Sequence, residues 1–294
     1  GCECYVAHRG RKYKEGKPDM SGWNLIVLAK KLQGYKNLIK MVSHSWTEGY
    51  YMRPRIDKEL LEKYHEGLII SSACLGGEIP KKVMAGDMEE AEKAVQWFKD
   101  LFGDDYYLEL QRHKTNRPDA NSEVYPLQQQ VNAELIQIAK KMNVKVIATN
   151  DVHFATEEDA DAHDRLICLS TGKDFDDPRR TRYTKQEWLK STAEMNQLFG
   201  DIPEALTNTL EIADKVEYYS IDSDALMPFF TIDESFGTEE GYKAKYSEAD
   251  MVEEFGEKEY KRLGGYDKVI RIKLESDYLR YLTMIGAEKR YGKD

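Results

Sequence analysis

The sequence predicts an α/β protein whose strands form a mostly parallel sheet or a barrel. Three observations favour this fold. Short apolar runs alternate with longer segments in which apolar residues recur at helical spacing. The run 144–149 is rich in β-branched residues, which is typical of a strand buried on both faces. Side chains that can bind metals follow three of the runs, where an α/β barrel carries its chemistry.

The first part of the chain is expected to be mainly helical. Two short helices are predicted over 24–32 and 35–45, separated at Gly34, because the apolar residues are closely spaced and Gly is a helix breaker. A turn over 53–56 then precedes a helix over 57–65. The apolar run 68–72 is short enough to predict a strand.

The middle of the chain carries the clearest helix signals. Asp87 is a predicted N-cap, Glu90 three residues later completes a capping-box pattern, and Gly103 follows the last turn. The remaining elements are predicted from apolar periodicity. They are strands over 106–111 and 144–149 and helices over 126–142, 157–169, 186–199 and 203–216.

Beyond residue 220 the pattern changes. Pro228 and the acidic stretch 233–259, with ten Asp or Glu against three Lys, are expected to form an exposed connector. Apolar residues return at helical spacing over 269–291. The predicted division is therefore a main domain over 1–220, an acidic connector over 221–265 and a helical segment over 266–294.

Composition restricts the class of protein. The net charge of the 294 residues is −10, of which −7 falls in the acidic stretch, so the chain is not a basic nucleic-acid coat. The four cysteines fit neither a disulfide framework nor a zinc finger, which favours a reducing cytoplasm. No apolar run approaches the length of a membrane span, so a soluble, cytoplasmic protein without a membrane partner is expected.

Metal-competent side chains follow three predicted strands. Cys74 follows 68–72, His113 follows 106–111, and Asp151 and His153 follow 144–149. In a barrel these strand ends converge, and such a mixed set of ligands suits zinc, manganese or iron. Each residue also has a structural interpretation: Cys74 as a small buried residue, His113 as a core or surface histidine, Asp151 as a helix cap. Their common placement favours the metal site.

Basic residues suggest a second, weaker hypothesis. The cluster 179–183 combines three arginines with Tyr183 and could contact DNA phosphate. An exposed loop that pairs with its own acidic residues is the favoured alternative. The same two interpretations apply to Arg53 and Arg55, again with surface ion pairs favoured.

Several stretches together resemble a known family. They are Gly1-Cys2-Glu3 and the segments 24–30, 34–38, 48–51, 54–57, 66–69, 148–153 and 201–209. On these residues the chain resembles the PHP (polymerase and histidinol phosphatase) domain of bacterial replicative DNA polymerase III alpha subunits. The similarity extends over residues 1–230, and 277–292 is similar to the helical run before the thumb and palm.

The resemblance implies a fold and a site. The fold is a distorted (β/α)7, TIM-like barrel with up to three metal ions at one mouth, followed by a helical connector. Carried over by position, the metal ligands are Glu3, Cys74, His113, Asp151 and His153, with Asp151 and His153 also catalytic. Only the resemblance promotes Glu3, because an acidic residue near a terminus is ordinarily a surface residue.

Two departures from the family matter. The family has a strand with a His-x-His motif and a later Asp-His segment, both upstream of the position of Gly1. We therefore expect a barrel that is incomplete at its N-terminus. We also expect the chain to be a fragment or a reading frame that starts late. Where the family often has His before the helix-like apolar run, this chain has Asn24. An amide binds such metals poorly, so one site is expected to be weakened.

The resemblance also implies a function in bacterial chromosomal DNA replication. The PHP site would act as a metal-dependent phosphoesterase or 3′–5′ exonuclease, and expected partners are DNA, through the parent polymerase, a proofreading exonuclease and a sliding clamp. The palm carboxylates that hold Mg²⁺ for polymerisation are absent, so the chain alone is not expected to synthesise DNA. Alternatives are a non-catalytic scaffold for the polymerase core and proofreading subunit, and a stand-alone PHP phosphatase, which 203–209 disfavours.

Overall fold

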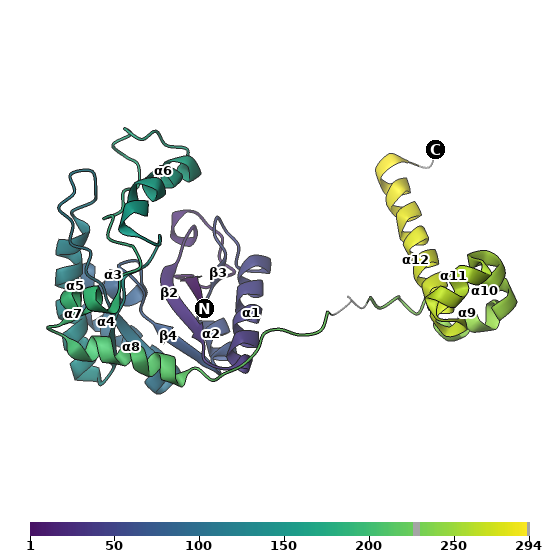
Figure 1. Ribbon diagram of the computed structural model, residues 1–294, viewed down its shortest axis with the longest axis horizontal. Coiled ribbons are helices and arrows are strands. Elements are labelled where there is room, and N and C mark those ends of the chain that lie inside the picture. Colours follow the sequence, from purple (N-terminus) through teal and green to yellow (C-terminus); the bar gives the residue numbers. More distant parts are fainter. Residues whose placement is uncertain (226–229, 293–294) are drawn as a thin grey trace. The chain divides into compact units, whose positions relative to one another are not determined.

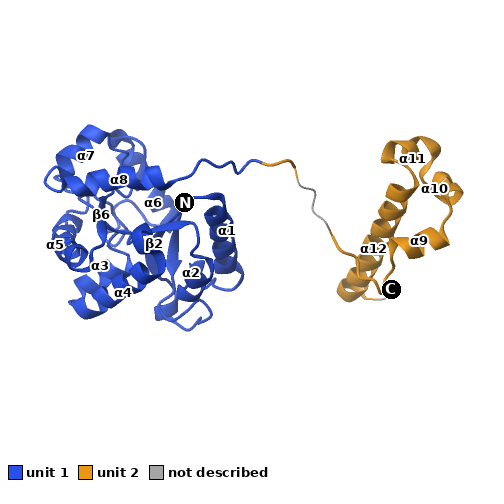
Figure 2. Ribbon diagram, turned by 90° about the horizontal axis from the view of Figure 1, so that it is seen from below, with its two compact units in different colours: residues 1–222 blue, residues 223–294 orange. Residues whose placement is uncertain are grey.

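The structure, a computed structural model, describes residues 1–225 and 230–292. Pro228, placed above in a connector, lies outside the described residues. The chain divides into two compact units, residues 1–222 and 223–294 (Figure 2). Each unit is described by itself. The predicted boundaries at 220 and 265 stay a prediction.

A six-stranded sheet forms the centre of unit 1. Its strands are β1 (Cys2–Val6), β2 (Trp23–Ala29), β3 (Arg55–Ile56), β4 (Leu68–Ser71), β5 (Tyr106–Leu110) and β6 (Lys145–Ala148). They lie in the order β3-β1-β2-β4-β5-β6. β2 runs antiparallel to both neighbours, and the other three neighbouring pairs are parallel. The carboxyl ends of five strands therefore share one edge of the sheet, together with the amino end of β2.

The mixed α/β class is confirmed, but the closed barrel is not. β3 and β6 lie at the two edges of the sheet and do not pair with each other among the described residues. β3 has only two paired residues, both used by β1. Helix α8 (Pro203–Lys215) occupies the edge next to β6, where the Asn208 side-chain amide donates to the Val146 carbonyl at 2.8 Å. An occupied edge cannot accept another strand.

The helix predicted over 24–32 is wrong, because most of this segment forms the central strand β2. Leu25 and Val27 are buried on one face of β2, and both strand edges pair, with β1 and β4. A continuous apolar run fits either a buried strand or a buried helix, and in this segment tertiary pairing decides. The strands β1 and β3 were not predicted, since their alternation is short and interrupted.

Helices surround the sheet in unit 1 (Figure 1). They are α1 (Leu32–Thr47), α2 (Lys58–Tyr64), α3 (Glu78–Met84), α4 (Met88–Phe102), α5 (Val124–Met142), α6 (Ala160–Thr171), α7 (Thr192–Phe199) and α8. All but α3 overlap a predicted helix. α1 runs through Gly34 instead of breaking there. The residue is glycine because a Cβ at this position would lie 1.9 Å from the Gly67 carbonyl oxygen. Gly34 serves close backbone approach, not helix termination.

Two helix limits have clear local causes. Asp87 caps α4, as predicted, by accepting from the Glu90 amide at 3.3 Å. The helix predicted over 186–199 begins only at Thr192, because Ser191 and Glu194 form a capping box at that point. Residues 186–188 instead stay extended and hydrogen-bond the segment after β6.

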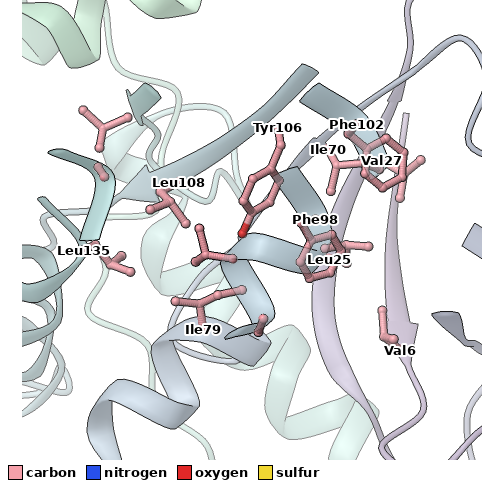
Figure 3. Packing of buried hydrophobic residues seen from close by; sticks show 14 of the residues in the cluster. Val6, Leu25, Val27, Ile70, Ile79, Phe98, Phe102, Tyr106, Leu108 and Leu135 are labelled. Atoms are coloured by element: carbon pink, nitrogen blue, oxygen red, sulfur yellow. The ribbon is translucent and has the colours of Figure 1, made fainter. Parts of the chain in front are cut away.

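The hydrophobic core lies on one face of the sheet. Alternate residues of the strands, such as Leu25, Val27, Ile70 and Leu108, pack against the helices (Figure 3). The Tyr106 ring stacks on Phe98 of α4 with ring centroids 5.1 Å apart. The opposite face therefore carries the intervening residues, among them polar side chains of β1, β4 and β5 that form the candidate site.

Unit 2 is a small helical unit. Helices α9 (Glu239–Lys245), α10 (Glu248–Phe255) and α11 (Glu257–Leu263) precede α12 (Tyr266–Tyr291). Met251, Tyr260, Val269 and Ile270 form its core. Within the segment predicted as a connector, residues 239–263 form helices, because Thr238 and Ser247 cap two of them and sparse apolar residues reach one core. Within the described residues, no helix has the length and apolar character needed to cross a membrane.

Candidate metal and phosphoester site

The carboxyl ends of β4, β5 and β6 bring three of the predicted site residues into one cavity. Because these strands are parallel neighbours, the segments that follow them leave the same edge of the sheet. Cys74, His113 and Asp151 line a cavity of about 210 Å³ at this edge. Residues 74–75, 111, 113 and 151 line it from three strand ends, and 181–184 and 187 line it from a later segment.

Two residues at this edge hold an unusual backbone conformation. Ala73, which precedes Cys74, has a φ of 61°, and Asp151 has a φ of 45°. For residues other than glycine this left-handed conformation costs about 1–3 kcal/mol and is found disproportionately at functional sites. The conformation turns the chain sharply at each strand end, so that the Cys74 and Asp151 side chains enter the cavity.

Glu3 reaches the site across the sheet. It lies on β1, opposite Ile26 of β2, on the face away from the core. The Asn24 side-chain amide donates to the Glu3 carboxylate at 2.6 Å and lies 3.6 Å from the Cys74 sulfur. Asn24 thus joins two predicted ligands, and it does so from the position where the family resemblance expects a histidine.

Negative groups gather around Asp151. Burial raises the pKa of the Asp151 carboxyl to about 6, and Glu3, Glu109 and Glu187 add to this effect against the opposing influence of His153. Burial also raises the pKa of the Cys74 thiol to about 11. The local environment therefore disfavours the ionised forms of both side chains, which a bound cation would favour.

Glu109 shows how the same edge stabilises a buried carboxylate without a cationic side chain. It accepts hydrogen bonds from the Ser71 and Thr149 hydroxyls, the latter at 2.6 Å, and from the Ala73 amide at 3.2 Å. Among the described residues, no lysine or arginine forms an ion pair with Glu3, Glu109 or Asp151. The edge is consequently rich in acceptors.

His113 is held by two protein hydrogen bonds. Its Nε2–H donates to the Asn150 carbonyl at 3.1 Å, since a carbonyl can only accept, and its Nδ1 accepts from the Gln128 amide at 3.1 Å. Gln128 also accepts from the His113 backbone N–H at 2.7 Å, so its orientation is fixed. Burial lowers the pKa of His113. In this arrangement both ring nitrogens are used.

His153 is placed differently. Its Nδ1–H donates to the Asp151 carbonyl at 2.6 Å, which leaves Nε2 as an acceptor for the Tyr183 hydroxyl at 3.2 Å. The His153 side chain is 30% exposed and is not among those that line the cavity. Its ring lies in an aromatic group with Tyr183 and His163, at centroid distances of 4.7 and 5.6 Å.

The segment 181–187 is the part of the site that sequence reasoning missed. Arg182, Tyr183 and Glu187 line the cavity. The Glu187 carboxylate accepts from the Thr184 hydroxyl at 2.6 Å and from two backbone amides, and its own carbonyl accepts from His153 N–H at 2.7 Å. Only the residue types of 179–183 gave a sequence signal, and the predicted helix over 186–199 hid Glu187.

The arginines of this region separate into two groups. Arg179 pairs with Asp177, and buried Arg180 binds both oxygens of Asp164 at 2.5 and 3.0 Å. The alternative of an exposed loop that pairs with its own acidic residues is therefore confirmed for Arg179 but not for Arg180, whose partner Asp164 belongs to α6, whereas Arg182 lines the cavity. The surface ion pair favoured for Arg55 is wrong, because this side chain is buried and donates to backbone carbonyls.

The fit of a metal ion to these residues is partial. Within residues 1–225 and 230–292, no three or more His, Cys, Asp and Glu side chains are arranged closely enough to hold one ion. The donor chemistry is nevertheless suitable, because carboxylates and a thiol share one acidic cavity and His153 has an unprotonated Nε2. Binding would require Asn24 to release Glu3 and Cys74, Gln128 to release His113, and Tyr183 to release His153.

Comparisons with known proteins find one family model and several relatives. Residues 1–113 match the PHP domain. DNA polymerase III subunit alpha of Borreliella burgdorferi is 42% identical over 242 residues, which are 81% of this chain and 20% of that protein. The Treponema pallidum subunit is 38% identical over 245 residues, or 82% of this chain and 20% of that protein. The Thermus aquaticus subunit is 37% identical over 221 residues, or 72% and 17%.

This chain spans about a fifth of the length of the curated relatives that it matches. The match to the PHP domain contains Glu3, Cys74 and His113, and it ends before Asp151 and His153. The expectation drawn from the sequence resemblance is thereby confirmed. The chain contains a PHP domain and is homologous to part of the bacterial DNA polymerase III alpha subunits.

Proposed function

We propose that the chain acts in bacterial DNA replication, as the PHP-containing part of a DNA polymerase III alpha subunit. The observation that carries this proposal is the identity of 42% over 242 residues with a DNA polymerase III subunit alpha, with further relatives of the same name. Polymerase activity, DNA and partners such as a proofreading exonuclease and a sliding clamp belong to the proposal for the whole protein.

The proposal includes a divalent cation, Zn²⁺, Mn²⁺ or Fe²⁺, in the cavity at the sheet edge. Glu3, Cys74 and Asp151 would supply its first ligands, and His113 and His153 would complete the set. Support comes from the acidic cavity, whose carboxylates have no lysine or arginine partner among the described residues, and from the raised pKa of Asp151. A cation would compensate this charge.

The surrounding residues suit the hydrolysis of a phosphate ester. A divalent ion supplies charge stabilisation and an activated water when it is bound. Arg182 lines the same cavity, and a guanidinium can bind phosphate oxygens through paired N–H groups. His153 would hold the ion through Nε2, in place of the hydrogen bond that this nitrogen now accepts from the Tyr183 hydroxyl. Asp151 and His153 are thus the proposed catalytic pair.

Substitution of Asp151 tests this site. The full chain is incubated with Mn²⁺ or Zn²⁺, bound metal is measured after gel filtration, and hydrolysis of a 3′-labelled single-stranded oligonucleotide is followed. Wild type should retain metal and cleave, and Asp151→Asn should lose at least about 100-fold in cleavage rate, as expected for a lost ligand. Asp100→Asn, the same change at an exposed position of α4, is the matched control.

A non-catalytic scaffold is the second candidate. The observation that favours it is the present arrangement of the site, in which Asn24 holds Glu3 and Gln128 occupies Nδ1 of His113. Absence of retained metal and of cleavage in wild type would overturn the hydrolytic proposal in favour of the scaffold. A stand-alone PHP phosphatase is opposed by the matches to DNA polymerase III alpha subunits, which extend well beyond residue 113.

A further inference from the structure

Another surface of unit 1 combines exposed aromatic rings with positive charge. We call it the basic–aromatic surface, and it consists of Lys12, Tyr13, Lys14, Lys17, Trp46 and Tyr50. All six side chains are exposed, with Trp46 at 58%, Tyr13 at 52% and Tyr50 at 46%. Its basic part follows the carboxyl end of β1, and its aromatic part lies at the end of α1.

The charge of this surface is not neutralised by the protein. The loop 9–17 contains five basic residues and one acidic residue, in a chain of net charge −10. Arg9 pairs with Asp19, and buried Arg11 pairs with Asp57 and Glu48. Lys12, Lys14 and Lys17 form no ion pair among the described residues. The three ammonium groups are therefore available to a ligand.

The backbone beneath these lysines is firmly held. Buried Arg55 donates to the carbonyls of Arg11 and Tyr13, at 3.0 and 2.8 Å, and to the Gly49 carbonyl at 3.0 Å. The buried Asp19 carboxylate accepts from the Glu15 amide at 2.9 Å. A loop fixed in this way loses little conformational entropy when its side chains bind a ligand.

Two further contacts join the loop to the segment that carries Trp46 and Tyr50. The Gly16 amide donates to the Tyr51 hydroxyl at 3.2 Å, and Arg11 binds Glu48 at 2.8 Å. The Trp46 and Tyr50 rings stack on each other, with centroids 5.4 Å apart and an angle of 13°. An exposed pair of parallel rings presents one further flat face of a kind on which a nucleobase can stack.

We propose that the basic–aromatic surface binds single-stranded nucleic acid. Unpaired lysines would contact the phosphates, while Trp46, Tyr50 and Tyr13 would stack on bases, the combination that sequence-tolerant single-strand binding uses. A protein partner would bury the apolar rings but would leave three unpaired lysines to be desolvated. The proposal concerns binding alone and goes beyond the hydrolytic function, because it requires neither the cavity nor a metal ion.

Binding of a fluorescein-labelled oligodeoxythymidine to the full chain, measured by anisotropy in EDTA at low salt, tests this proposal. The triple variant Lys12→Glu, Lys14→Glu and Lys17→Glu should weaken binding at least about tenfold and flatten its salt dependence by about two units of log–log slope. The matched control changes Lys36, Lys81 and Lys140 to glutamate. These are three exposed lysines on helices of the same unit, and this variant should bind the oligonucleotide like wild type.

A second variant tests the stacking. Trp46→Ala with Tyr50→Ala should weaken binding of the single strand at least about fivefold and leave binding to a duplex of equal length unchanged. Thermal unfolding of every variant confirms that it is folded. The proposal is overturned if wild type does not bind, if the two lysine triples weaken binding equally, or if the alanine variant binds the single strand as wild type does.

Discussion

The two ends of strand β5 differ in how the carboxylates near them are paired, on the same face of the sheet. Near the amino end, Tyr107 lies among carboxylates that are each paired with a lysine. Two residues further, Glu109 marks the edge where carboxylates have no cationic side-chain partner among the described residues. This contrast supports the cation site proposed at the second end.

The amino end is a compensated ion network. Glu211 of α8 accepts from the Tyr107 hydroxyl at 2.7 Å and pairs with Lys145 at 2.5 Å and Lys215 at 3.1 Å. The hydrogen bond from Lys145 is the largest cause that lowers the pKa of Glu211, to about 2. This network joins α8 to the sheet, and its contribution is to stability.

The carboxyl end has the reverse property. Asp151 is strained in its backbone and its pKa is raised, so its ionised form destabilises the fold unless a cation is present. Sites that carry out chemistry commonly hold such destabilised groups, whereas structural networks do not. The comparison therefore predicts that cations, pH and substitution act with opposite signs at the two ends.

The largest expected effect is stabilisation by metal. Mn²⁺ at 100 times its dissociation constant should raise the free energy of unfolding of wild-type chain by about 2.7 kcal/mol, because the ion binds only the folded site. Asp151→Asn should lose this gain, and Glu211→Gln should keep it. Thermal unfolding with and without Mn²⁺ measures both, and equal gains in the two variants would contradict the comparison.

The second effect is a pH dependence in the presence of chelator. The folded-state pKa of Asp151 is about 6 against an ordinary 3.8, so the folded protein binds the proton more tightly and wild type loses stability as pH rises through this range. Asp151→Asn removes that loss. In urea unfolding, the free energy of unfolding of the variant should equal that of wild type near pH 4 and exceed it by about 2 kcal/mol near pH 8. A difference independent of pH would refute the assignment, and Asp100→Asn is the control.

The smallest effect has the opposite sign. The pKa of Glu211 is lowered from 4.5 to about 2, so its stabilisation is present above pH 4.5 and is lost as pH falls toward 2. Because the Glu211 side chain is 30% exposed, solvent screens the pairs, and Glu211→Gln should cost about 1 kcal/mol at pH 7. The cost should vanish at pH 2. An undiminished cost at low pH would show that packing, not charge, is responsible.

Sequence reasoning located the elements with strong local signals. Apolar runs and end signals, which do not depend on distant residues, predicted the strands β4, β5 and β6 and the capped helix α4. β2 was not predicted, because its apolar run is identical in character to a buried helix and becomes a strand only through pairing with β1 and β4. Local patterns cannot encode such pairing.

The candidate site was found to a similar extent. Cys74, His113 and Asp151 were expected to converge, since residues after parallel strands share an edge, and they line one cavity. Glu187 was missed because its role depends on an extended segment folding back over the site. The hydrogen bond between His113 and Gln128 could not be predicted from the sequence either, since Gln128 lies on helix α5, which packs across the strand end.

The reversed direction of β2 has a consequence for how this site can change over time. Because β2 runs against its neighbours, its first residues, and not its last, lie beside the carboxyl end of β4, and Asn24 meets Glu3 and Cys74 there. Codons for asparagine and histidine differ by a single base. One point mutation would therefore replace the Asn24 amide, which holds Glu3, by the imidazole that the family resemblance expects at this position, without moving any strand.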